Sequence, residues 1–367
     1  MKIRTDRDEL LKPLQRIGGV VERRQTLPIL ANVLIAATAE RVELTATDLE
    51  VELRTGAPAE VSEEFEFTLP ARKLMDICKA LPEGAPIELS VEGERAVLRS
   101  GRSRFTLGLL PAADFPAIEP TAPSQRLRIA EGDLKRLIER TYFAMAQQDV
   151  RYYLNGMLLE AGAGRVRAVA TDGHRLALSE GKLPGDQEGA EVQVILPRKA
   201  VLELGRLLAD TDAQVELEIS SNHVRMRFGE ESFTTKLIDG RFPDYERVIP
   251  RDANKLVKVE RDGFRHALAR ASILSNEKYR GIRFNISDGV LQLQAHNPEQ
   301  EEAEEEIEVD YHGEELVIGF NVSYLLDVLG VLTADTVDLA LRDSNSSCLI
   351  SAEGDDGSRY VVMPMRL

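Results

Sequence analysis

Runs in which apolar and polar residues alternate fill much of this chain, and six other stretches have an apolar residue at every third or fourth position. Alternation is typical of strands with one buried face, and the longer period is typical of amphipathic helices. The alternating runs include "RVELTATDLEVELR", "QVELEISSNHVRMRF" and "GVLQLQAHN", and turn sequences such as "SDG", "AGAG" and "SSN" separate the runs. This pattern predicts a meander of antiparallel strands.

Helices are predicted twice in each third of the chain. The early helix of each third spans 6–21, 131–146 and 260–274, and the second spans 71–81, 197–209 and 321–333. Pro70 and Pro197 stand at helix starts, where a missing N–H costs nothing. Asn321 is a predicted N-cap. Two helices with strand-rich segments in every third predict an α+β fold.

Three sequence anchors recur in the same order at one spacing. "ATDLEVELR", "ATDGHRLAL" and a degenerate "AHNPEQEEA" begin at Ala46, Ala170 and Ala295, which are 124 and 125 residues apart. A strand end that leads into a helix recurs as "LPARKLMDICKALP", "LPRKAVLELGRLLA" and "FNVSYLLDVLGVLT". A final segment recurs around the aromatic residues Phe105, Phe233 and Tyr360.

A repeat of this length is a whole domain rather than a solenoid unit. We therefore expect three tandem domains, which span 1–125, 126–252 and 253–367. The alternative interpretation is that ordinary alternation of helices and strands produced an accidental likeness.

The composition is that of a globular protein, with 43% hydrophobic and 29% charged residues over 367 positions. The first residues, "MKIRTDRDELL", carry acids where a signal peptide would have an apolar run, and no stretch has the roughly 18 apolar residues of a membrane helix. Cys78 and Cys348 stand far apart, so the sequence predicts neither a disulfide framework nor a zinc site. We expect a cytoplasmic protein.

The net charge of −16 argues against a general nucleic-acid binder, because neutralising phosphates needs clustered Lys and Arg. The charge is nevertheless unevenly distributed, because the six predicted helices together carry +4 and the rest of the chain −20. Solvated helix faces would explain this segregation, and so would one face that meets an anion.

Two segments have opposite charge. Glu302, Glu304, Glu306 and Glu308 fall on one face of a predicted strand, with Ala303, Ile307 and Val309 on the other. In the first repeat, "LRSGRSRFTLGL" places Arg99, Arg102 and Arg104 beside Phe105 and Leu107. An acidic edge in one repeat and a basic edge in another suit a head-to-tail contact, which closes a ring or continues as a fibre.

The chain ends on "RYVVMPMRL", an apolar run where chain ends usually fray into water. Such a run either completes a core strand or offers an apolar surface to a partner. Met side chains are flexible and polarizable, which suits a surface that accepts several different peptides.

Evidence for an enzyme is weak. The five histidines have no metal-ligand spacing, and neither a phosphate loop nor a nucleophile elbow is present in the sequence. "TDGHR" could place His174 as a base that Asp172 orients, which keeps a hydrolase as a lesser alternative. We expect a non-catalytic protein with no cofactor and no metal.

The repeat and the charge layout together resemble the β subunit of bacterial DNA polymerase III, the sliding-clamp family, over the whole chain. The most specific segments are "TLPIL", "QDVRYYLNGM", "ATDGHRLAL", "DGRFPDYERVIP", "SNEKYRG" and "YVVMPMRL". The resemblance implies three tandem two-helix, antiparallel-sheet DNA-clamp domains in each chain of a head-to-tail dimeric ring. Such a ring slides on double-stranded DNA without sequence specificity and tethers replicative and repair polymerases, the clamp loader and other proteins through short peptide motifs.

The resemblance also implies roles for particular residues. The DNA-contacting residues would be Arg24, Arg72, Gln148, Tyr152 and Tyr153, with Arg23 as an alternative to Arg24. The partner-peptide pocket would comprise Leu154, Thr171, Gly173, His174, Arg175, Leu176, Pro243, Arg247, Val248, Ser347, Val361, Val362, Met363, Pro364, Met365, Arg366 and Leu367. The dimer interface would comprise Lys73, Arg102, Arg104, Phe105, Leu107, Ile273, Leu274, Glu299, Glu301, Glu302, Glu304 and Glu305.

Two alternatives remain open at this point. A half-buried strand with aromatic packing would also explain "RYY" at 151–153. A dimeric adaptor or scaffold that never binds DNA would also explain the repeats and the complementary edges.

Overall fold

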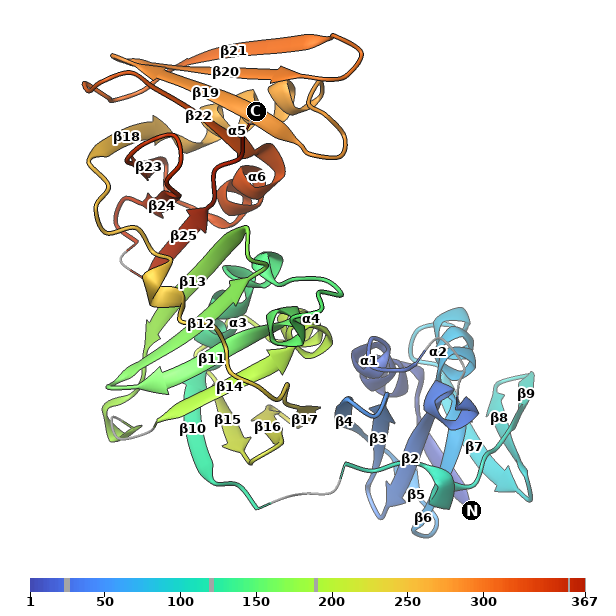
Figure 1. The fold of residues 1–367 in the computed structure, drawn as a ribbon. Helices are drawn as coiled ribbons and strands as arrows, with labels where there is room; N and C mark the ends of the chain where they lie inside the picture. Colours follow the sequence, from blue (N-terminus) through green and yellow to red (C-terminus); the bar gives the residue numbers. More distant parts are fainter. Residues whose placement is uncertain (23–26, 119–121, 188–190, 356, 367) are drawn as a thin grey trace. The chain divides into compact units, whose positions relative to one another are not determined.

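A computed structural model describes residues 1–22, 27–118, 122–187, 191–355 and 357–366 (Figure 1). The chain divides into two compact units, 1–132 with 202–237 and 133–201 with 238–367. Helices α3 (Glu131–Glu139) and α4 (Arg198–Leu207) each contribute residues to both units.

The first unit holds two antiparallel sheets. The smaller has the strand order β5 (Glu60–Val61), β1 (Lys2–Asp6), β7 (Pro86–Glu92), β8 (Arg95–Ser100), β9 (Ser103–Gly108). The larger has the order β10 (Gln125–Ala130), β15 (Gln214–Ile219), β16 (His223–Phe228), β17 (Glu231–Lys236), β4 (Val51–Pro58), β3 (Arg41–Thr47), β2 (Asn32–Thr38), β6 (Phe65–Pro70). Helices α1 (Arg7–Ile17) and α2 (Ala71–Ala80) pack on each other, and α1 buries Leu10, Leu14 and Ile17.

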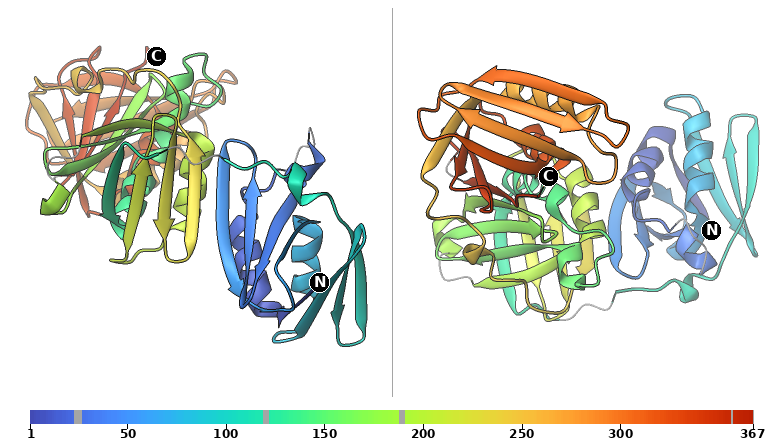
Figure 2. Two further views of the ribbon diagram at one scale, coloured as in Figure 1. Left: turned by 90° about the horizontal axis from the view of Figure 1, so that it is seen from below. Right: turned by 45° about the horizontal axis from the view of Figure 1, so that its top comes forward.

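The second unit also holds two antiparallel sheets. The larger has the order β14 (Val192–Pro197), β11 (Gly156–Gly162), β12 (Arg165–Thr171), β13 (Arg175–Lys182), β25 (Ser358–Val362), β24 (Cys348–Ala352), β23 (Thr336–Leu341), β18 (Lys255–Glu260). The smaller has the order β21 (Glu302–Glu308), β20 (Val290–His296), β19 (Gly281–Ser287), β22 (Leu316–Asn321). Helix α5 (Arg261–Ser272) packs on β20 and β21 and on α6 (Val322–Val331), as Figures 1 and 2 show.

Short 3-10 turns connect several of these elements: η1 (Pro28–Ala31), η2 (Ala112–Asp114), η3 (Tyr142–Ala144), η4 (Tyr152–Asn155), η5 (Gly185–Gln187) and η6 (Tyr245–Arg247). The six predicted helices are confirmed, and each is shorter than predicted. After α3, for example, the Thr141 hydroxyl donates to the Leu137 carbonyl at 2.7 Å and the chain turns into η3. Ala144 at the end of this 3-10 turn and Met145 directly after it are buried, although neither belongs to the helix whose apolar period they continue.

Helix capping follows the sequence in part. The predicted N-cap is confirmed, because the Asn321 side chain accepts a hydrogen bond from the Ser323 N–H at 2.9 Å. Glu260 is a second side-chain cap that the sequence did not indicate, and its carboxylate accepts from the N–H groups of Asp262 and Gly263 at the start of α5. These bonds lower the pKa of the Glu260 carboxyl.

The repeat is visible in individual hydrogen bonds. The Asp48 carboxylate accepts from the N–H groups of residues 50 and 51 at 2.9 and 2.7 Å, and that of Asp172 accepts from the N–H groups of residues 174 and 175 at 2.9 and 3.0 Å. The residue between has a left-handed backbone in both turns, with φ of 78° at Leu49 and 88° at Gly173. Leucine rarely adopts this conformation, so a shared turn geometry outweighs local preference at Leu49. The α+β fold of repeated antiparallel units is confirmed.

Candidate functional site

One face of the larger sheet in the second unit carries an apolar cluster. Directly opposed residues of antiparallel strands share a face, and here Val169, Leu178 and Arg359 are opposed in one row while Leu176, Val361 and Leu349 are opposed in the next. The segment 238–249 covers this face with Phe242, Tyr245, Val248 and other apolar side chains. The cluster therefore joins β11–β14 with the last strand of the chain.

Of the implied pocket residues, Leu176 and Val361 belong to this cluster and Val248 packs against it, and the implied residues differ in depth. Leu154, Leu176 and Val361 are buried, and Tyr153 and Val248 pack against the cluster while partly exposed. The partly buried members are Thr171, Gly173, Arg175, Ser347, Pro364 and Met365, and the exposed members are His174, Pro243, Arg247, Met363 and Arg366. Leu367 lies outside the described residues. Val362 alternates to the opposite face of β25, where it is fully buried.

The apolar chain end completes a core strand, which is the first of the two uses that its sequence allows. Tyr360, Val361 and Val362 complete the sheet between β13 and β24 and are 0–1% exposed. Beyond the strand, the Met363 N–H donates to the His174 carbonyl and the Met365 N–H donates to the Gly319 carbonyl, both at 2.9 Å. The main chain is held from both sides, while the Met363 side chain stays 39% exposed. A held backbone with an exposed thioether suits an apolar contact surface.

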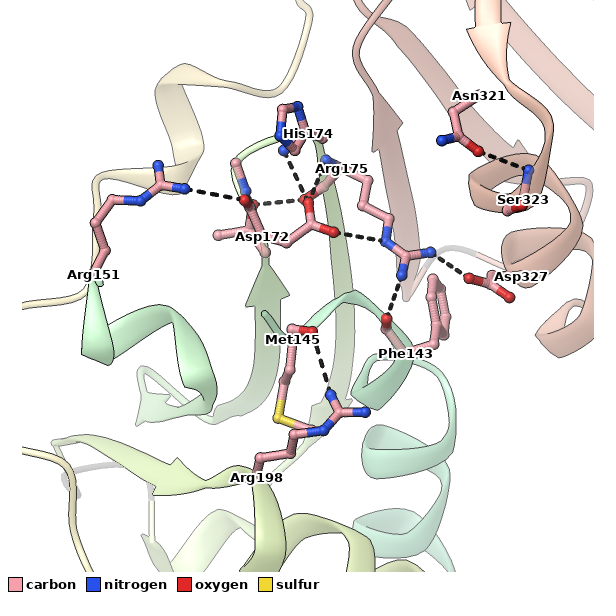
Figure 3. A network of polar contacts seen from close by, with 12 residues as sticks. Phe143, Met145, Arg151, Asp172, His174, Arg175, Arg198, Asn321, Ser323 and Asp327 are labelled. Carbon is pink, nitrogen blue, oxygen red and sulfur yellow. Dashed lines mark hydrogen bonds and ion pairs between the residues drawn. The ribbon is translucent and has the colours of Figure 1, made fainter. Parts of the chain in front are cut away.

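Arg175 is the centre of a polar network at the edge of this surface (Figure 3). Its guanidinium donates to the Asp172 carboxylate at 3.2 Å, to the Phe143 carbonyl at 2.6 Å and to the Asp327 carboxylate. It also lies 5.4 Å from the ring centre of Phe143 and 4.5 Å from that of Tyr324. Only 12% of the side chain is exposed, so its donors are occupied within the chain. Arg175 thus joins the turn at 171–175 to helix α6, a positioning role that the sequence alone did not indicate.

Replacing Arg175 by alanine should destabilise the fold by about 2–4 kcal/mol, because two carboxylates would lose a largely buried partner. The free energy of unfolding in urea measures this change. Arg151→Ala is the matched control, since Arg151 is 47% exposed and pairs with Asp149, and we expect it to cost less than about 1 kcal/mol. Equal losses from the two variants would contradict the positioning role.

The implied DNA contacts fall in separate places. Gln148 and Tyr152 are exposed in one loop, and Gln148 has a left-handed backbone with φ of 57°. Tyr152 lies in the turn η4 rather than in a strand, which corrects the alternative interpretation of "RYY", and its ring meets Tyr153 edge-on at 5.8 Å. Arg72 is exposed on α2 in the first unit. Arg23 and Arg24 lie outside the described residues.

The loop that follows Gln148, residues 149–155, is held by hydrogen bonds. The Asn155 side chain accepts from the Asp149 N–H and donates to the Asp149 carbonyl, both at 2.9 Å. Arg151 donates to the Asp149 carboxylate at 2.8 and 3.0 Å and thereby lowers the pKa of Asp149 to about 2. These bonds fix the backbone and the side chain of the residue that follows Gln148.

The implied interface residues gather at two sheet edges. Arg104, Phe105 and Leu107 lie on β9, which is an edge strand of its sheet. Arg102 is exposed in the turn before β9, and Lys73 is exposed on α2. Glu302, Glu304 and Glu305 lie on β21, the edge strand of the other unit's smaller sheet, and Glu299 and Glu301 are exposed in the turn before it. The alternation predicted for β21 is confirmed, with its even-numbered glutamates exposed.

The apolar interface residues differ in exposure. Ile273 is 76% exposed at the end of α5, and Leu274 and Phe105 are partly buried. Leu107 is already buried within its own unit. Glu305 points toward α5, where Arg270 donates to it at 2.7 and 2.8 Å and lowers the pKa of its carboxyl. Glu305 is thus engaged inside the chain.

The residues of the hydrolase alternative are not arranged as a base and its orienting acid. The Asp172 carboxylate accepts from two backbone N–H groups and from Arg175, while the exposed His174 ring stacks with Tyr324 at 6.5 Å between ring centres. Within the described parts of the chain, no group of His, Cys, Asp and Glu side chains could hold a metal ion. None of the described helices is long and apolar enough to cross a membrane.

Tandem α+β repeats, two open sheet edges of opposite charge and an exposed Met363 beside an apolar cluster are features of a protein that works by assembly and binding. Three family models match in order: the DNA polymerase III beta subunit N-terminal domain over 1–119, the central domain over 128–244 and the C-terminal domain over 246–366. The chain belongs to the DNA polymerase III β subunit family, the bacterial sliding clamps.

Similar proteins agree along the whole chain. The beta sliding clamps of Pseudomonas putida and Escherichia coli are 57% and 49% identical, with 100% of both chains covered. The crystal structure of the Pseudomonas aeruginosa β subunit has a TM-score of 0.96 at 55% identity and full coverage of both chains. Another structure of that clamp, with a TM-score of 0.95, is bound to griselimycin. The DNA replication clamp function and the expectation of a non-catalytic protein are confirmed by these relatives.

Proposed function

We propose that two copies of this chain close head-to-tail into a ring that encircles duplex DNA. The ring slides without sequence specificity, and partner proteins bind by short peptides at the surface around the exposed Met363, next to the apolar cluster. The partners are the clamp loader, the replicative and repair polymerases and other DNA-handling proteins. Because the chromosome is the substrate for sliding, the protein works in the cytoplasm.

Ring closure is supported by a strand pairing that occurs twice within the chain, each time between the last strand of one repeat and a strand of the repeat before it. The last strand of the second repeat, β17, pairs with β4, the strand after the turn of the first repeat. The last strand of the third repeat, β25, pairs in the same way with β13 of the second. The last strand of the first repeat, β9, and the strand after the turn of the third repeat, β21, are left, and both are sheet edges. Pairing β9 of one copy with β21 of another continues the rule and covers both edges.

The same rule predicts the register of this contact. Phe233 is opposite Leu53, and Tyr360 is opposite Ala177. Ala170 and Ala295 begin the same sequence anchor in the second and third repeats. Ala177 is opposite Ala170 and Ala303 is opposite Ala295, so Ala303 is the counterpart of Ala177 in the third repeat. Phe105 should therefore lie opposite Ala303 of the second copy.

One step along antiparallel strands, Arg104 should lie opposite Glu304. This pairing also relieves a like-charge contact, because Arg104 is opposite Arg99 within its own sheet. Glu302 and Glu306 flank Glu304 on the exposed face of β21, which adds to the attraction for Arg104 and Arg102.

The exposed Gln148, Tyr152 and Arg72 support the DNA contacts. An arginine meets a phosphate electrostatically, and amide and phenol groups hydrogen-bond backbone oxygens without reading the bases. Few such contacts are needed, since the closed ring retains DNA by topology and not by affinity. Weak contacts leave the ring free to slide.

A topological assay tests encirclement. After loading by the clamp loader, the protein should remain on nicked circular DNA at moderate salt and should leave once the circle is cut into a linear molecule. An ordinary electrostatic binder would instead dissociate from both forms alike as salt rises. Equal retention on the two DNA forms would reject the ring and favour a plain adaptor or surface binder.

A further inference from the structure

A cavity of about 410 Å³ adjoins the apolar cluster next to the proposed peptide surface. Arg165, Arg167, Arg251 and Arg359 line it together with Glu180 and Glu246. The cavity therefore carries more positive than negative charge, although the chain as a whole has a net charge of −16. Such a local excess attracts an anionic group.

The two glutamates of the cavity are shared among three of its arginines. Glu180 accepts from Arg167 and lies 3.5 Å from Arg165. Glu246 accepts from Arg167 at 3.1 Å and lies 3.9 Å from Arg251. Arg359 is exposed on β25 and has no ion pair with any residue that the structure describes. The cavity thus has guanidinium donors to spare.

The cavity is continuous with the apolar cluster. Leu178, Ile249 and Leu349 line the cavity and also belong to the cluster or pack against it. The strand register explains this continuity, because Arg359 is directly opposite Leu178 and lies two residues before Val361 on the same face of β25. A peptide whose apolar side chains contact the partly exposed Val248 and Leu349 has its next residues within reach of Arg359.

We infer that this cavity binds acidic side chains that flank the apolar motif of partner peptides. The inference rests on the proposed peptide surface and adds a determinant of partner choice to it. A carboxylate can accept two parallel N–H bonds from a guanidinium, and the apolar wall formed by Leu178 and Leu349 shields those bonds from water. A peptide with amides in place of the acids would lose the charge-assisted bonds and keep its apolar contacts.

Titration of matched peptides tests the inference. One peptide carries an apolar motif with two flanking glutamates, a second has glutamines at the same positions, and both are made with the flank before and after the motif. On the dimeric protein, the acidic peptide in one of the two orientations should bind about three- to ten-fold more tightly than its amide partner. Arg359→Ala should remove this difference and leave the affinity of the amide peptide unchanged.

Controls separate this inference from the proposed function. Arg95→Ala removes the same charge from an exposed position in the first unit and should preserve the acid preference. Arg251→Ala, in a loop, is a second variant whose effect does not depend on the integrity of β25. Equal affinities of the acidic and amide peptides for the unaltered protein would overturn the acidic site and leave the peptide surface standing. An acid preference that survives both Arg359→Ala and Arg251→Ala would overturn its location, and absence of binding by all peptides would overturn both proposals.

Discussion

Replacing Ile273 and Leu274 by alanine should convert the two-chain assembly into monomers of 40.8 kDa. Ile273 is 76% exposed at the end of α5, so its apolar surface is available to the Phe105 side of a second copy. Losing such a side chain from an interface costs about 2 kcal/mol, and a two-chain ring contains the contact twice. The dissociation constant should therefore rise by about 10³-fold, which light scattering or sedimentation at micromolar concentration will detect.

The control for this prediction lies on β22, at the edge of the sheet opposite β21. Val317 on β22 is 53% exposed, and Val317→Ala should leave the dimer intact. The register is checked by reversing charges: Arg104→Glu should weaken the dimer, and adding Glu304→Arg to the same chain should restore it. A dimer that persists in the Ile273/Leu274 variant, or a double charge variant no better than the single one, would reject this edge or this register.

Replacing Met363 by aspartate should reduce the affinity for a polymerase-derived peptide by at least about 100-fold, while the dimer stays intact. Met363 follows the buried end of β25 and is 39% exposed. A carboxylate there would have to lose its water when an apolar peptide side chain covers it. Isothermal titration of the peptide measures the effect, and Met365→Asp should act in the same direction.

Two comparisons make this prediction specific. Met363→Leu keeps an apolar side chain of similar volume, so its affinity should stay within about three-fold of the original. Leu256→Asp places the same charge at an apolar position that is 49% exposed on β18 and should not affect the peptide. Unchanged affinity in the Met363→Asp protein would reject the pocket.

The individual elements of this fold could be predicted from local pattern. The helices that begin at Arg7, Ala71 and Arg261 follow apolar periods of three to four residues, and the exposed glutamates of β21 follow from strict alternation. The cap at Asn321 is local as well, because its side chain accepts a hydrogen bond from the N–H group of Ser323, two residues ahead. In each case the deciding interactions lie within a few residues, so the sequence alone carries them.

Side chains with distant partners could be assigned only from the tertiary structure. Alternation places Glu305 on the face of β21 opposite to its glutamate neighbours, but its partner Arg270 on α5 is known only from the structure. Val361 and Val362 point to opposite faces of β25 by simple alternation, but only the structure shows that Val361 is the one that belongs to the apolar cluster. Arg175 looks like one more exposed cation in "TDGHR", whereas its contacts with Asp327 and Tyr324 come from a helix more than 140 residues away in the sequence.

The sequence by itself therefore determined the repeat, the α+β class and the two oppositely charged edges of this protein, because these follow from periods and charges that recur along the chain. Only the tertiary structure decided that β17 and β25 each pair with the preceding repeat and that Arg359 lies beside the apolar cluster. The physical reason is that alternation determines which side chains share a face of a strand, while the choice of neighbouring strand and register depends on packing between segments that are distant in sequence.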